Sequence, residues 1–139
     1  MDGKNRTLVF FGLKKANHAP CLALQKIKEV TNIKKEFTIS DLVFLIAPRI
    51  TAAGRMDDAR KAISCFVEDD DELSVEKAME LHSDNTLRKE EDRKMTIEAL
   101  AMLKEEDPEQ KQKSTMLFQP HWHKGVVGIV ASRILEQYY

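Results

Sequence analysis

The alternation of apolar and polar positions along the chain predicts a mainly helical protein. In most segments apolar residues recur at steps of three and four, which places them on one face of a helix. The helices expected from this spacing run from about Pro20 to Val30, from Ser40, as the cap, to Ala47, from about Asp57 to Val67, from about Glu72 to Glu106, and from Val126 to Tyr139. The stretch from Thr7 to Phe11 fits a strand by its residue types, yet Asn5 is also a suitable cap for a helix there.

The stretch from Glu72 to Glu106 has a stripe that is apolar at both ends and polar in the middle. The expected stripe consists of Val75, Met79, His82, Thr86, Arg93, Ile97 and Leu100. A helix of about 35 residues reaches roughly 50 Å, and one with nothing packed on its middle spans between two bodies. We interpret this helix as a connector; the alternative is a helix broken near Ser83 into two ordinary ones.

The pattern changes after the long helix. A polar hinge, EEDPEQKQK, stops the helix at Pro108, and residues Ser114 to Phe118 alternate like a strand. The turn QPHWHKG follows, and then a helix whose core-facing residues are expected to be Val127, Val130, Ile134 and Leu135. A strand, a glycine-bearing turn and a helix together expose free N–H groups at the helix start, which is a natural anion site.

The composition is typical of a soluble globular protein. The 139 residues are 42% hydrophobic and 32% charged, without an apolar run near the ~20 residues that cross a bilayer and without the apolar core of a signal peptide. We therefore expect a cytoplasmic protein with no membrane association, built as one domain or as one domain with part of another. Cys21 and Cys65 lie far apart without a paired motif and are expected to be small buried hydrophobic residues.

The net charge of −1 conceals a segregation of charge along the chain. Residues 1–35 carry eight Lys or Arg against two Asp or Glu, and residues 111–139 carry four against one, whereas residues 68–110 carry six against sixteen. A polyanion is therefore expected at the two ends of the sequence and not along its middle. The alternative is that these charges only solvate surface helices.

The segment IAPRITAAGRMDD contains two arginines with small residues between them. Arginine is favoured over lysine where a planar anion must be gripped in two places, and the small residues would let a sugar-phosphate backbone approach Arg49 and Arg55 closely. Gly54 permits a backbone turn that other residues resist. The pair suits a phosphodiester; the alternative is a helix end whose arginines bond to carbonyls or to Asp57 and Asp58.

The chain contains no recognisable catalytic centre of its own. His121 and His123 stand one residue apart, but a metal ion would need further ligands that no nearby cluster supplies. No arrangement of Ser, His and Asp with a known spacing and no phosphate loop of the GxxxxGK type is present. The carboxylates from Asp69 to Asp71 lie at a helix start, where acidic residues are expected for electrostatic reasons.

Two longer motifs carry a resemblance to a known family. The segment IAPRITAAGRMDDARKA is similar to the APR-(I/L)-NAAGR segment of the RecJ family of single-stranded-DNA-specific exonucleases. The segment WHKGVVGIVASRILEQYY is similar to the WH-(K/x)-GV-(V/I)-GIVASR-(I/L)-E segment of the same proteins. With the start at Asn5 and the long helix between the motifs, the resemblance covers essentially the whole chain. Thr51 stands where the family usually has asparagine, so the side-chain amide is missing there.

The resemblance implies an internal fragment of a DHH-family phosphoesterase. In that family a preceding α/β domain binds two Mn²⁺ or Mg²⁺ ions and cleaves DNA from the 5′ end, and its DHH signature is absent from this sequence. The implied parts are the helical end of the DHH domain in 1–67, a connector helix in 68–107, and the first strand and helix of the DHH-associated domain in 108–139. The fold class is then mainly α, as a piece of an α/β enzyme, and the fragment alone is expected to be inactive.

The resemblance also implies which residues face the substrate. No catalytic residue and no metal ligand is expected within this chain, since the Mn²⁺ or Mg²⁺ ligands belong to the rest of the parent protein. The residues expected to contact single-stranded DNA are Arg49, Thr51, Gly54, Arg55, His123, Lys124, Gly125, Gly128, Ser132 and Arg133. For His123 the alternative is a hydrogen bond that fixes the turn.

Other functions and partners stay open from the sequence. A different DHH-family phosphoesterase would act on short RNA or on a nucleotide, whereas a non-enzymatic helical module would bind a protein partner through its acidic helix. The module would show a continuous apolar groove, with both arginines buried in salt bridges. Loss of neighbouring domains would expose apolar patches, so we also expect self-association through exposed helices.

Overall fold

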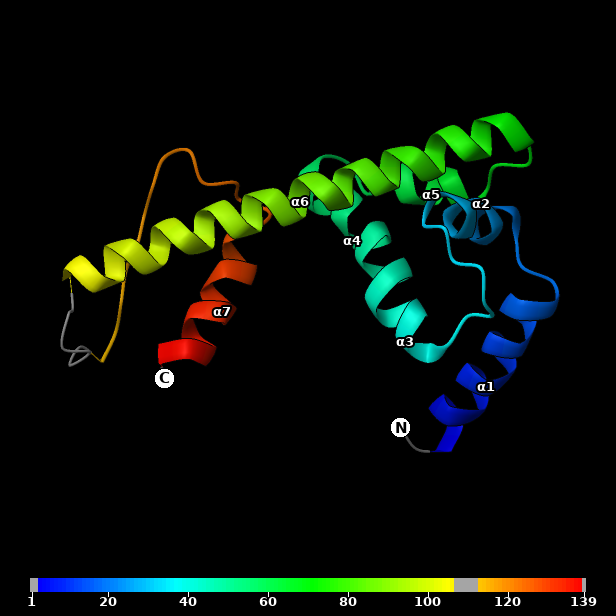
Figure 1. Cartoon of the computed structure of the whole chain (residues 1–139), viewed down its shortest axis with the longest axis horizontal. Coiled ribbons are helices and arrows are strands. Elements are labelled where there is room, and N and C mark those ends of the chain that lie inside the picture. The colour runs from blue at the N-terminus through cyan, green and yellow to red at the C-terminus, as the bar shows by residue number, and fades with distance from the viewer. Residues whose placement is uncertain (1–2, 107–112, 139) are drawn as a thin grey trace. The chain divides into compact units, whose positions relative to one another are not determined.

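The computed structural model of the chain describes residues 3–106 and 113–138, and only helices, turns and irregular segments occur among them (Figure 1). The mainly α fold class is thus confirmed. The chain divides into two compact units, Met1–Asn85 and Thr86–Tyr139. No described helix is long and apolar enough to cross a membrane.

The first unit consists of short helices and the beginning of a long one. Its elements are α1 (Gly3–His18), α2 (Leu22–Val30), α3 (Ile39–Asp41), the π-helical turn η1 (Leu42–Ile46), α4 (Ala47–Met56), α5 (Arg60–Phe66) and the first part of α6 (Asp71–Glu106). The expected helices from Pro20 and from Asp57 are therefore confirmed as α2 and α5, with small shifts at their ends. The ambiguous N-terminal stretch is helical, as part of α1.

The end of α1 is tied to the segment before α3 by one asparagine. The side-chain oxygen of Asn17 accepts from the backbone N–H of Phe37 at 2.7 Å, and its amide donates to the Phe37 carbonyl at 3.0 Å. This pairing satisfies both backbone groups of Phe37, whose ring is buried in the core of the unit. It fixes where the loop after α2 returns toward the next helix.

The helix was expected to end at Ala47, before Pro48, but the run from α3 through α4 is continuous. Thr38, and not Ser40, is the cap: its hydroxyl accepts from the Asp41 N–H at 3.2 Å, and the Asp41 carboxylate accepts from the Thr38 N–H at 2.9 Å. A proline ring crowds the carbonyl four residues before it and has no N–H to donate. The wider π turn of η1, in which the Ala47 N–H reaches the Leu42 carbonyl, leads into α4 with Pro48 in its first turn.

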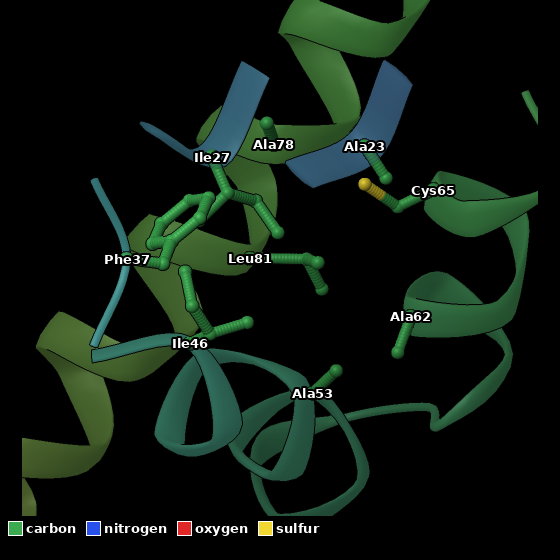
Figure 2. Packing of buried hydrophobic residues seen from close by; sticks show 9 residues of the cluster. All are labelled: Ala23, Ile27, Phe37, Ile46, Ala53, Ala62, Cys65, Ala78 and Leu81. Carbon is green, nitrogen blue, oxygen red and sulfur yellow. The ribbon is translucent and has the colours of Figure 1, made fainter. Parts of the chain in front are cut away.

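The core of the first unit lies where these helices meet (Figure 2). Figure 2 shows Ile27, Phe37, Ile46 and Leu81 directed toward one another from α2, the loop, η1 and α6. Cys65 of α5 is fully buried, as expected, and burial raises the pKa of its thiol because the charged thiolate is poorly solvated there. Cys21 is exposed, so its expected burial is wrong: it precedes α2 as the N-cap residue and faces solvent.

Helix α6 is a single helix of 36 residues, so the expected long helix is confirmed and the break near Ser83 is not found. The expected stripe was wrong by one position, because Met79 and Ile97 are 57% and 61% exposed. The side chains that α6 buries are Ser74, Ala78, Leu81, Asp84, Asn85, Asp92, Met95, Ala99 and Leu103. The true face therefore passes through alanines and polar residues, and the middle of the helix is packed and not bare.

The second unit combines the later part of α6 with an irregular segment and α7 (Val127–Tyr138). The strand expected from Ser114 to Phe118 is not formed: no other strand lies among the described residues to pair with its backbone. The QPHWHKG turn and the following helix are confirmed. Within α7, Val130 is buried, whereas Val127 and Leu135 are exposed, contrary to expectation. The hinge at Pro108 lies outside the described residues.

Candidate nucleic-acid interface

Helix α4 carries Arg49, and the structure places its guanidinium in the interior. The residue is 7% exposed. Its Nη1 donates to the Leu45 carbonyl at 2.5 Å, and Nε and Nη2 lie 3.3 and 3.2 Å from Nδ1 of His82 on α6. Burial lowers the pKa of the Arg49 guanidinium, because the charged form loses hydration. Since arginine only donates, Nδ1 of His82 is the acceptor, and Arg49 ties α4 to α6.

Arg55 lies on the last turn of the same helix, and its side chain is exposed. Residues six positions apart on an α-helix are separated by about 240° around the axis. The two arginines of the motif therefore point in different directions, and the structure does not bring them together. A cation in the last turn also interacts favourably with the helix dipole.

The small residues of the first motif serve packing. Ala52 and Ala53 are completely buried, so they do not line a surface that a sugar-phosphate could approach. Gly54 lies inside α4 and not in a turn; a Cβ added there would lie 3.1 Å from Cβ of Ala59, which is closer than nearly all such contacts. Glycine therefore leaves room for the close approach of the chain after α4, where a larger residue would require Ala59 to shift by a few tenths of an ångström. Thr51 is exposed, and its hydroxyl donates to the Pro48 carbonyl at 3.3 Å.

The turn of the second motif is held by a carboxylate of α6. Oε2 of Glu98 accepts from Nε1 of Trp122 at 2.7 Å and lies 2.9 Å from Nε2 of His121. The hydrogen bond from Trp122, and then the one from His121, lower the pKa of Glu98, because both favour its ionised form. Nδ1 of His123 accepts from the Gly125 N–H at 3.2 Å, which supports the reading of His123 as the residue that fixes the turn.

The remaining predicted residues lie along the exposed side of the turn and α7. Lys124 and Gly128 are exposed, and a Cβ added at Gly128 would meet nothing within 4 Å. The Ser132 hydroxyl donates to the Gly128 carbonyl at 3.0 Å. Nη2 of Arg133 lies 2.9 Å from Oδ2 of Asp92. Lys124, Ser132 and Arg133 thus belong to the second unit, whereas α4 belongs to the first.

Sequence reasoning missed three residues that organise the two motifs: His82, Asp92 and Glu98. His82 was expected on the packed stripe of the long helix, but neither carboxylate was. A usable signal exists for Asp92, because it continues the spacing of three and four that joins Ala78 and Leu81 to Met95. An acidic residue at an apolar position of a helix indicates a buried partner.

The described residues do not form a metal centre. Among residues 3–106 and 113–138, no group of three or more His, Cys, Asp or Glu side chains is placed to hold a metal ion. The residues present thus do not fit a metal site, and no metal-dependent step is assigned to them. Fold and site together define a helical segment that carries two arginine-bearing motifs.

The comparisons with known proteins show which proteins this segment is similar to. No family model matches the chain. The chain is 36% identical to the single-stranded-DNA-specific exonuclease RecJ of Haemophilus influenzae and 34% identical to that of Escherichia coli, in each case over 100% of this chain and 25% of the relative. It thus spans about a quarter of the length of these curated relatives.

Solved RecJ structures also resemble this chain. A crystal structure of exonuclease RecJ bound to manganese matches with a TM-score of 0.85 at 34% identity, over 98% of this chain and 34% of that one. A crystal structure of Thermus thermophilus RecJ in complex with Mn²⁺ matches with a TM-score of 0.82 at 36% identity, over 97% of this chain and 20% of that one. The chain is therefore homologous, from end to end, to a segment of the RecJ family, which confirms the resemblance seen in its motifs.

Proposed function

We propose that this chain supplies the helical segment of an exonuclease that hydrolyses phosphodiester bonds of single-stranded DNA from the 5′ end. The observation that carries the proposal is the end-to-end match to RecJ exonucleases in sequence and in structure, with a TM-score of 0.85. Hydrolysis would depend on the Mn²⁺ or Mg²⁺ ions with which RecJ relatives have been solved. Their ligands would come from outside the described residues.

Within this function the exposed cations are the candidates for contact with the DNA backbone. Arg55 on α4, and Lys124 and Arg133 in the second motif, present positive charge at the surface. Phosphate contacts of this kind fix a strand in place without reading its sequence. Thr51, Gly54, His123, Gly125, Gly128 and Ser132 stay candidates as neighbours of these cations. Arg49 also stays a candidate, but its bonds to Leu45 and His82 favour a role in holding α4.

A chimera tests the proposal directly. The matching stretch of the E. coli relative, which aligns over 143 residues, would be replaced by this chain. We expect the chimera to release 5′ nucleotides from labelled single-stranded DNA with Mn²⁺ and to spare duplex DNA. Arg55→Ala should weaken DNA binding about equally for all sequences, whereas Lys89→Ala, an exposed cation on α6, is the matched control.

Two results would count against the proposal. One is a chimera that folds, as judged by circular dichroism, binds Mn²⁺ like the relative, and yet degrades no DNA. The other is a chimera that hydrolyses short RNA or nucleotides in preference to DNA, which would indicate a different phosphoesterase. Removal of Mn²⁺ with EDTA should abolish all nuclease activity, and addition of the ion should restore it.

A further inference from the structure

The middle of α6 buries a carboxylate that the proposed function does not use. Asp92 is 2% exposed, on a face where the helix otherwise buries mainly alanine and other apolar side chains. Its Oδ2 lies 2.9 Å from Nη2 of Arg133 on α7 and 3.5 Å from Nη1 of Arg88, one turn earlier on α6. The Thr96 hydroxyl donates to the Asp92 carbonyl at 2.6 Å and lies 3.5 Å from Oδ1.

A buried carboxylate is a costly way to fill this position. An apolar side chain of similar size would pack there without losing hydration, and replacing buried ion pairs by apolar residues is often neutral or stabilising. The presence of Asp92 is therefore not explained by stability alone. The residue that it meets on α7 is Arg133, whose side chain remains 53% exposed. One end of the ion pair is thus fixed in the interior while the other reaches the surface.

We propose that Asp92 is a positioning residue that holds the Arg133 guanidinium at the surface in the orientation that meets a DNA phosphate. The inference rests on the proposed function. Arginine has five N–H donors in a rigid fork, so the contact through Nη2 leaves others for an anion on the exposed side. A long side chain that is already ordered loses less freedom when it binds.

Asp92 has two arginine partners. Its Oδ2 lies within ion-pair distance of both Arg88 and Arg133. Arg88 is largely buried, with a side chain that is 15% exposed, and it compensates the carboxylate from within the helix. Arg133 can therefore face an anion without leaving Asp92 unpaired in the interior.

The test uses the full chain and four variants. Affinity for a fluorescein-labelled oligothymidylate is measured at several salt concentrations for wild type, Arg133→Ala, Asp92→Asn and the double variant. Asp84→Asn is the matched control, because Asp84 is also buried on α6 but belongs to the first unit, where it pairs with Lys61 of α5. In parallel, NMR of the arginine side chains reports how fast the Arg133 guanidinium rotates.

The proposal predicts how each variant changes DNA binding and the rotation of the Arg133 guanidinium. Arg133→Ala and Asp92→Asn should each weaken binding about tenfold and lower the slope of log K against log salt by about 0.7, the value for one phosphate contact on a single strand. Asp92→Asn should cause no further loss in the Arg133→Ala background. It should also speed rotation of the Arg133 guanidinium, whereas Asp84→Asn should change neither measurement.

Opposite outcomes would overturn the inference in distinguishable ways. If Asp92→Asn weakens binding equally in both backgrounds, or leaves Arg133 rotation unchanged, Asp92 is only structural and the proposed function stands. If Arg133→Ala binds DNA like wild type, the contact assigned to Arg133 fails, and the inference fails with it. If Asp92→Asn unfolds, Asp92→Glu is used in its place, because it keeps the carboxylate. A wild-type salt slope for Asp92→Glu would support the proposal, whereas the lower slope seen with Arg133→Ala would overturn it.

Discussion

The burial of Arg49 makes the replacement of this side chain the sharpest test of how the first motif works. Arg49→Ala removes the hydrogen bond to the Leu45 carbonyl at 2.5 Å and the contacts to Nδ1 of His82 at 3.2 and 3.3 Å. Hydrogen bonds to a charged group are worth about 1.5–3 kcal/mol each. Removing the buried charge also removes its desolvation cost, which offsets part of this loss. We expect a net loss of about 2–4 kcal/mol in the free energy of unfolding.

Such a loss is easily measured. Small domains are stable by about 5–15 kcal/mol, and their free energy of unfolding falls by about 1–3 kcal/mol for each molar of urea. The urea midpoint of Arg49→Ala, followed by circular dichroism at 222 nm, should therefore fall by about 1–2 M. Arg49→Met, which keeps much of the packing volume but makes no hydrogen bond, should lose nearly as much. Arg55→Ala is the exposed control from the same helix, and we expect it to change stability by less than about 1 kcal/mol.

The same proteins should also be tested for DNA binding. If Arg49 is structural, a folded sample of Arg49→Ala below its urea midpoint should bind single-stranded DNA with the wild-type salt slope, and Arg55→Ala should show the smaller slope. The reasoning would be refuted by the reverse: an Arg49→Ala chain with an unchanged urea midpoint and a salt slope reduced by about 0.7. That result would mean that the guanidinium leaves its buried position to contact phosphate.

Three further predictions concern the carboxylate of Glu98, the activity of the isolated chain and an apolar cleft beside α7. Trp122 and His121 lower the pKa of Glu98, so the ionised Glu98 contributes stability above its unfolded pKa of ~4.3, and this contribution is lost as pH falls through the lower folded pKa. Fluorescence emission of Trp122, the sole tryptophan, should report this change, and Glu98→Gln should abolish it. The isolated chain should release no nucleotides from labelled single-stranded DNA with Mn²⁺, and metal-dependent release would contradict this. An apolar cleft of about 540 Å³ beside α7, lined by Trp122, Val130 and Ile134 among others, should promote self-association, so a purely monomeric species in sedimentation at micromolar concentration would count against it.

The sequence predicted most helices because helix formation depends on the local pattern of apolar and polar residues, whereas the direction of a single side chain depends on tertiary packing. Helix α6 illustrates the difference. Its length and continuity follow from an uninterrupted run of helix-forming residues. Its buried face was misplaced by one position, because alanine and paired aspartate occupy it while Met79 and Ile97 face outward. Hydrophobicity alone does not reveal that Asp92 has two arginine partners.

The first motif shows a similar limit. Arg49 and Arg55 were expected to act as a pair because they are close in sequence, but a helical backbone sends residues at this spacing to different sides. The continuation of the helix through Pro48 was not predicted, since the spacing of apolar residues does not indicate the π turn that precedes the proline. The motif was therefore recognised correctly as a family feature, although its geometry could not be derived from the spacing of its residues.

Helix α6 connects these observations in one physical argument. Along its length it offers His82 to Arg49 of the first motif, Asp92 to Arg133 and Glu98 to Trp122 of the second. Of these three residues, Asp92 is buried, and an apolar side chain could have been packed at its position at lower cost. A helix that merely separated two bodies would not need acceptors at the positions where the two motifs meet it. The choice of acceptors therefore indicates that α6 orients the side chains of both motifs.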